Sequence, residues 1–304
     1  MKYKRIFIPA IFLIILSTFV YASIQAQKAN GGLAVHPSNF DITAVPDKNP
    51  TGTITVDNLT DQPMQIVVNL RNFTAQGEEG SVNLTAEDTT YSLAKWIVVT
   101  PMTVEINAHS SQSFAFTIEV PKNAEPGGHF GSIVFATAPS KNLTGSGAAL
   151  SQEVASLILF KIPGDTKEQA VLESFTTDKS FYEFGPVTFD ARVKNEGGVH
   201  IAPVGSIVVR GWFGQKFIVP LEVRNVLPDS VRRIPSTLNK KLLVGNFTAT
   251  LIATYGTKGQ QLYQTVEFSA FPVRYGIVVL IILILIFLAR KRIMKSIRML
   301  LTGK

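Results

Sequence analysis

The chain has 304 residues, with 29 Lys and Arg against 22 Asp and Glu, and it contains no cysteine. The absence of cysteine excludes disulfides, cysteine metal sites and thiol nucleophiles. Ten of the bases lie in the first five residues or from Arg274 onward, where there is no acid, so the remaining 19 bases and 22 acids give a charge of −3. The basic balance therefore belongs to the two ends of the chain, which argues against a nucleic-acid partner.

The first 26 residues have the pattern of a signal peptide. Bases within the first five residues precede an apolar run over residues 6–22, which is the arrangement of a secretory signal helix. Cleavage sites with small residues end at Ala22 and at Ala26, and the alternative is an uncleaved anchor. Either arrangement places residues 27–270 outside the cytoplasm.

Residues 33–163 are expected to form a first β-sandwich. Apolar and polar side chains alternate over residues 53–56, 66–70 and 114–120, and a period of two indicates strands with one buried face. Turn sequences rich in Pro, Gly, Asn and Asp separate these segments, which is typical of an antiparallel sandwich. We expect Trp96 to pack in the core, and we expect Gly127, Gly128 and Gly131 to supply a tight turn and a bulge.

A second sandwich is expected over residues 168–270, after a short linker at residues 163–167. The predicted strands cover residues 187–193, 206–210, 216–223 and 262–268, and this half also contains Trp212. The predicted fold is therefore all-β, with two tandem immunoglobulin-like antiparallel β-sandwiches between an N-terminal signal helix and a C-terminal transmembrane helix.

Residues 271–289 are predicted to cross a membrane. The run from residue 275 to 289 is apolar, and adding residues 271–274 brings the helix to about 28 Å, close to a hydrocarbon core of about 30 Å. The alternative, a buried core helix, fits poorly because a cluster of bases follows directly. Since Lys and Arg stay on the cytoplasmic side, residues 290–304 are expected to be a cytoplasmic tail, and the protein a single-pass cell-membrane protein.

No catalytic or metal-binding constellation is visible. His36, His109, His129 and His200 lack neighbours at metal-ligand spacing, and no phosphate loop or nucleophile elbow occurs. The acid pairs at residues 78–79 and 87–88 are expected to be solvated, with a bound calcium ion as the alternative. We therefore predict a non-enzyme with no catalytic, cofactor-binding or metal residues, no cofactor and no small-molecule substrate. Five sequons mark candidate glycosylation sites, at Asn58, Asn72, Asn83, Asn142 and Asn246.

The order of segments resembles a known family. The strand at residues 52–58, the Leu-Ala-Lys-Trp segment ending at Trp96 and the Pro-Gly-Gly-His-Phe-Gly segment at residues 126–131 are similar to the peptidoglycan-binding domain of WxL-interacting proteins. That resemblance implies a signal, two sandwiches, a C-terminal membrane span and a basic tail, with the second sandwich binding a partner. The segment from Trp96 to Pro101 and the Pro-Gly turn after it are also similar to the first domain of periplasmic pilus chaperones.

Two functions follow from these patterns. The first is a membrane-anchored extracytoplasmic binding or adhesion module that docks a cell-wall polymer or another surface protein, with the lipid bilayer as its second partner. The alternative is a pilus-chaperone-like assembly factor that acts on exported proteins by strand addition.

Overall fold

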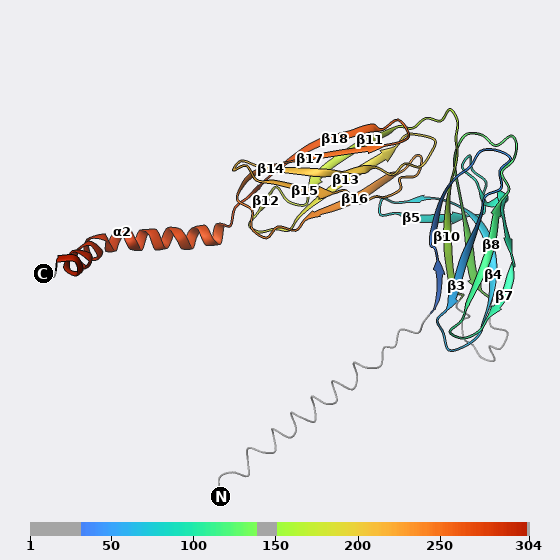
Figure 1. The fold of residues 1–304 in the computed structure, drawn as a ribbon, viewed down its shortest axis with the longest axis horizontal. Helices are drawn as coiled ribbons and strands as arrows, with labels where there is room; N and C mark the ends of the chain where they lie inside the picture. The colour runs from blue at the N-terminus through green and yellow to red at the C-terminus, as the bar shows by residue number, and fades with distance from the viewer. Residues whose placement is uncertain (1–31, 139–150, 303–304) are drawn as a thin grey trace, which may run out of the picture.

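The computed structural model describes residues 32–138 and 151–302 and contains two β-sandwiches followed by one long helix (Figure 1). The predicted signal peptide at residues 1–26 and the sequon at Asn142 lie outside the described residues. The two sandwiches pack end against side, and the helix leaves the second sandwich at the end farthest from the first (Figure 1).

The first sandwich is built from β1 to β10. In chain order these are β1 Leu33–His36, β2 Asn39–Thr43, β3 Thr51–Asn58, β4 Met64–Gln76, β5 Ser81–Thr85, β6 Ile97–Thr100, β7 Thr103–Ile106, β8 Ser111–Ile118, β9 Gly127–Thr137 and β10 Glu153–Ile162, with the short helix η1 at Ala94–Trp96. One sheet has the order β1-β3-β8-β6, and the other has the order β2-β10-β9-β4-β5, with β7 also paired to β4.

The second sandwich is built from β11 to β18. In chain order these are β11 Ala170–Thr177, β12 Phe181–Tyr182, β13 Val187–Asn195, β14 Val204–Gly211, β15 Lys216–Pro220, β16 Val231–Leu238, β17 Gly245–Tyr255 and β18 Gln260–Ala270. Its sheets have the orders β11-β13-β16 and β12-β18-β17-β14-β15.

In both sandwiches the N-terminal segment forms two successive strands, one in each sheet. β1 pairs antiparallel with β3 and β2 pairs parallel with β10; in the second sandwich, β11 pairs antiparallel with β13 and β12 pairs parallel with β18. Every other ladder is antiparallel. This is an immunoglobulin-like layout, so the predicted fold of two tandem immunoglobulin-like sandwiches is confirmed.

Each sandwich has its own aromatic core. Phe114, Phe135 and Phe160 are fully buried between the sheets of the first, and Phe189 and Phe247 are fully buried in the second. The alternation seen in the sequence thus points one face of each strand inward, as the pleat requires. β9 departs from it, because nearly all of its residues are buried.

Three glycines lie in β9, and the expectation from the sequence that they supply a tight turn and a bulge is wrong. Gly127 and Gly128 begin the strand and Gly131 lies within it, in unbroken register with β10. The Gly128 amide donates to the carbonyl of Gly198 at 2.9 Å, and a Cβ atom at Gly128 would lie 3.2 Å from the Cα atom of Val199. The same Cβ atom would lie 2.8 Å from Cζ of Phe130, so the Phe130 ring and the backbone of the second sandwich together favour glycine at position 128.

The helix α2 extends over Val273–Thr302. It continues from the predicted span into the basic tail without a break. Its segment Val273–Lys291 has 19 residues, is long and apolar enough to cross a membrane and is not buried against the sandwiches. At about 1.5 Å per residue this segment spans about 28 Å, close to the thickness of a hydrocarbon core.

Candidate functional site: the cleft between the sandwiches

The two sandwiches are joined by polar contacts along one seam. Lys161, near the end of β10, donates from Nζ to Oε1 of Glu168 at 2.6 Å, and both side chains are largely buried. Glu168 Oε2 also accepts hydrogen bonds from the backbone and hydroxyl of Thr257 at 2.7 Å. Burial works to raise the pKa of Glu168, but these hydrogen bonds and the ammonium of Lys161 lower it overall. The carboxylate is therefore held in its charged form at the joint.

A histidine of the second sandwich makes a further contact with the first. His200 Nε2 lies 3.1 Å from Oδ1 of Asp41, and its ring meets Phe130 edge to face with 5.7 Å between centroids. The hydrogen bond to His200 lowers the pKa of Asp41. Tyr91 donates from its hydroxyl to Asp229 at 3.1 Å.

The hairpin between β4 and β5 reaches across to the second sandwich. Glu78 forms a two-point ion pair with Arg192, and Glu79 pairs with Arg233 at 3.0 Å. The amide of Arg233 also donates to the carbonyl of Glu78 at 2.9 Å. The expectation that this acid pair is only solvated is therefore incomplete: the Glu79 side chain is 64% exposed, as expected, but both carboxylates also pair with arginines of the second sandwich.

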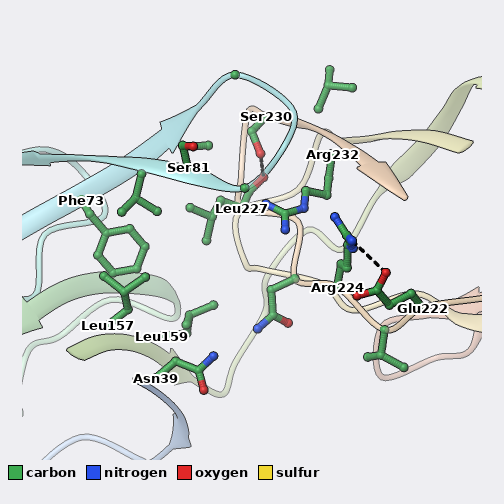
Figure 2. A pocket seen from close by; sticks show the side chains of 17 residues that line it. Asn39, Phe73, Ser81, Leu157, Leu159, Glu222, Arg224, Leu227, Ser230 and Arg232 are labelled. Carbon is green, nitrogen blue, oxygen red and sulfur yellow. Dashed lines mark hydrogen bonds and ion pairs between the residues drawn. The ribbon is translucent and has the colours of Figure 1, made fainter. Parts of the chain in front are cut away.

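Between the hairpin and the second sandwich lies a pocket of about 460 Å³, which we call the cleft (Figure 2). One wall comes from the outer face of the first sandwich and is apolar, with Phe73, Leu157 and Leu159 beside Leu227 from the other side. Figure 2 shows Arg224 and Arg232, both from the second sandwich, across the pocket from Phe73 and Leu157. The cleft thus combines an apolar wall with a charged one, formed by two arginines and by Glu222.

Arg232 is the unusual residue of the cleft. Its guanidinium lies against Gly80, where a Cβ atom would sit 1.4 Å from Nη1, so any other residue at position 80 would displace it. No carboxylate in the described ranges lies within ion-pair distance of Arg232, and its Nε is buried without a hydrogen-bond partner. Burial and the charge of Arg224 lower its pKa, whereas Arg224 itself pairs with Glu222 at 2.7 Å. Glu79 and Glu222 act on this guanidinium only from a distance, and a guanidinium without a directly paired carboxylate favours an anionic ligand.

Trp96, the aromatic singled out in the sequence, lies away from the cleft. It is half-buried at the edge of the first core, where it meets His129 at a centroid distance of 4.5 Å and Phe160 edge to face at 6.3 Å. This supports a packing role and not an exposed platform.

The other residues singled out in the sequence are histidines on the surface and asparagines in the sequons. His36 and His109 each lie beside an aspartate on the surface, and within residues 32–138 and 151–302 no three His, Asp or Glu side chains gather as a metal site. Asn58 and Asn72 are buried, so the folded chain cannot carry a glycan at either sequon.

No site residues were predicted from the sequence, and the cleft was not predicted. The cleft is lined by residues from strands as far apart in the sequence as β2 and β16, so no local sequence motif predicts it. The sequence holds one weak indication of the cleft. Arg224 and Arg232 lie on either side of a Leu-Pro-Asp-Ser turn, and the nearby acidic residues are too few, at helix or strand spacing, to pair with both arginines.

No protein-family model matches the chain, and a search of curated proteins finds no match. Among solved structures, the chain is similar to one described as a chaperone–tip adhesin complex of CFA/I fimbriae biogenesis (14% identity, TM-score 0.41, 77% of this chain and 98% of that one). It is also similar to the Salmonella enterica SafA pilin–SafB chaperone complex (11% identity, TM-score 0.39, 78% and 97%) and to a PapD-like domain of human CEP192 (10% identity, TM-score 0.31, 44% and 87%).

Proposed function

We propose that the chain is a membrane-anchored extracytoplasmic binding module that docks a cell-wall polymer or another surface protein in the cleft. The observation that carries this proposal is Arg232, a half-buried guanidinium without an acidic partner in the described chain, facing an apolar wall. Carboxylates of an acidic polymer or peptide fit such a guanidinium, because the charge-assisted hydrogen bond is stronger than a neutral one.

The membrane attachment in this proposal is supported by α2. The span Val273–Lys291 is followed by bases and no acid, so the positive-inside rule favours a cytoplasmic C-terminus and places both sandwiches outside. The same layout supports membership of the WxL-interacting family, which we retain as part of the proposal.

Sedimentation with purified bacterial cell wall tests the cleft. We expect the full chain in detergent to pellet with the wall and Arg232→Gln to bind roughly tenfold more weakly, because a hydrogen bond to a charged group contributes about 1.5–3 kcal/mol and 1.4 kcal/mol is tenfold. Arg210→Gln is the matched control, since Arg210 is exposed on β14 outside the cleft. Equal binding by the parent and both variants would remove the cleft from the proposal.

A second function, assembly of exported proteins by strand addition, is favoured by the edge of β10. β10 pairs with β9 along its whole length, whereas β2 covers only the part from Leu157 to Lys161. Along the rest of this edge, the exposed Glu153 and the half-buried Val154 and Ala155 have no strand paired to them in the described chain, whereas Ser156 is buried against Pro37. This short stretch is where a partner strand would add.

The two functions differ in a refolding assay. When a denatured exported β-protein is diluted to refold, its aggregation scatters light. An assembly factor added in equal amount suppresses this scattering, whereas a wall-binding module leaves it unchanged and pellets with cell wall. Suppressed scattering without wall binding would favour the second function over the first.

A further inference from the structure

The end of the second sandwich from which α2 leaves is well defined by strand register. β18 ends at Ala270, which pairs with Gly245 at the start of β17, and α2 begins at Val273. The amide of Trp212, in the turn between β14 and β15, donates to the carbonyl of Asn246 at 3.1 Å. That turn therefore lies at the helix end, where Figure 1 also places β12 and β14.

This end exposes a cluster of large apolar side chains, which we call the apolar rim. Trp212 is 78% exposed and Phe213 is 73% exposed, and their neighbours in the rim are also exposed, namely Phe181, Leu242 and Phe271. The ring of Phe213 lies over Gly245, 3.2 Å from the position of a Cβ atom. Single exposed apolar residues need no explanation, but a group of this size on one end marks an interaction surface.

Lysines surround the rim. Lys179, Lys216, Lys240 and Lys241 are exposed on the turns and strand ends of this end, and none of them lies within ion-pair distance of a carboxylate in the described chain. The ammonium of Lys240 lies 5.8 Å from the ring centroid of Phe217. Two nearby acids are engaged, since Asp178 accepts from the hydroxyl of Tyr182 and Glu183 pairs with Arg274. Glu267 of β18 is exposed beside Trp212 and has no ion-pair partner in the described chain.

The start of α2 is fixed to the sandwich. Glu183 accepts from the amide of Arg274 at 3.0 Å and pairs with its guanidinium at 3.3 Å. The rings of Phe184 and Tyr275 meet edge to face with 5.6 Å between centroids. Because these contacts tie the helix to the rim, a bilayer that receives α2 is brought directly against the exposed aromatics.

We propose that the apolar rim rests on the outer leaflet, with Trp212 and Phe213 among the lipid headgroups and the lysines against anionic phosphates. This inference rests on the membrane anchoring proposed above. Tryptophan and phenylalanine suit this interface because it offers both an apolar and a wet side, and lysines near an anionic surface are attracted to it. The tether makes contact intramolecular, so even a weak surface affinity keeps the rim docked.

Lipid quenching of tryptophan tests this docking. The full chain is reconstituted in vesicles of equal parts phosphatidylcholine and phosphatidylglycerol, with and without bromine on the upper acyl chains. The chain has two tryptophans, so Trp96→Phe reports Trp212 alone. We expect bromine to lower the Trp212 emission by roughly twofold, because an interfacial ring lies beside the upper acyl chains.

Two controls keep the test specific. Trp212→Phe leaves Trp96, which is remote from the rim and stays unquenched. Tyr263→Trp, in a chain lacking both native tryptophans, places a ring on β18 toward the other end, at a position that is 66% exposed, and also stays unquenched.

The possible failures are distinguishable. Trp212 emission that bromine leaves unchanged, in protein that alkaline carbonate does not extract, overturns docking and leaves the anchoring intact. Protein that carbonate extracts overturns both proposals. Unchanged quenching in vesicles without phosphatidylglycerol removes the lysines from the proposal and leaves the aromatic insertion.

Discussion

Two buried asparagines perform the same task in the two sandwiches. Asn58 ends β3 and donates to the carbonyls of Gln62, Ile106 and Asn107 at 2.7–3.1 Å. Asn195 ends β13 and donates to the carbonyls of Val199 and Val226, at 2.7 and 2.9 Å. Each amide therefore fastens the loop after its own strand to a loop from the other side of the sandwich, and both side chains are completely buried.

Replacing Asn195 by alanine should destabilise the second sandwich. The carbonyl of Val199 and the amide of Gly197, which donates to Oδ1 of Asn195 at 2.9 Å, would lose this partner in a buried site, whereas the carbonyl of Val226 keeps its bond from the amide of Ile201. We expect a loss of about 1–3 kcal/mol for each group that remains unsatisfied. Calorimetry of the full chain in detergent measures the shift, and Asn239→Ala, at an exposed position, is the control. Equal melting of the two variants would contradict this account of Asn195.

The two tryptophans should respond differently to truncation. Trp96→Ala removes a half-buried ring that contacts Phe160 and His129, so we expect a cost below the roughly 3–5 kcal/mol typical of a fully buried aromatic ring. Trp212→Ala removes a ring that is 78% exposed and should change stability by no more than about 0.5 kcal/mol. Thermal unfolding of both variants measures these effects. A larger loss for Trp212→Ala would mean that its ring packs against the sandwich.

At the scale of elements, the β4–β5 hairpin is the main bridge between the sandwiches. Gly77 and Gly80 have positive φ values of 62° and 93° and shape its tip, which suits glycine because it has no Cβ atom. The tip presents Glu78 to Arg192, and the ion pair lowers the pKa of Glu78. The hairpin also forms one side of the cleft, so any loosening of the bridge should open the cleft.

Acid should release this bridge. Because the pKa of Glu78 is lower in the folded chain than its ordinary value of 4.5, the ion pair stabilises the folded state above that value, and the contribution is lost as the pH falls through the folded pKa. We expect the amide of Arg233, which donates to the carbonyl of Glu78, to exchange faster with solvent deuterium at low pH after correction for intrinsic exchange. Glu78→Gln should remove most of this dependence, and an unchanged dependence in that variant would assign it to another group.

At the scale of the whole molecule, the sequence predicted the repeated local patterns and missed the contacts between distant segments. Alternation over residues 53–56 and 187–193 predicted β3 and β13 because a pleated strand with one buried face imposes that period. The same alternation could not show that Trp212 is exposed, since a turn residue has no partner to define its face. The cleft was equally hidden, because Phe73 and Arg232 meet only after both sandwiches have folded and docked. The role of Gly128 was wrongly predicted for the same reason, because Gly198 and Val199 approach it only once the sandwiches have docked.

The joint between the sandwiches combines a buried ion pair with backbone and aromatic contacts. Lys161 and Glu168 have side chains that are 19% and 6% exposed, and the pair lies beside the chain crossing from β10 to β11. His200 and Gly198 add contacts to Asp41 and Gly128. A joint of this kind holds the orientation of the two sandwiches, so their unfolding should be coupled.

Lys161→Met tests this coupling. Removing the ammonium leaves the Glu168 carboxylate with only its hydrogen bonds from Thr257. Breaking a fully buried ion pair typically costs about 3–5 kcal/mol, and we expect a smaller loss here because the Lys161 side chain is 19% exposed. We expect the calorimetric transitions of the two sandwiches, closely overlapping in the parent, to separate in the variant. The double variant Lys161→Met with Glu168→Gln removes both charges and should recover part of the lost stability, because the unpaired carboxylate is gone. The difference between its loss of unfolding free energy and the sum of the losses of the two single variants gives the interaction energy of the pair. Strictly additive losses would show that the two charges do not interact and that the orientation of the sandwiches is held by the hairpin and the Asp41–His200 contact.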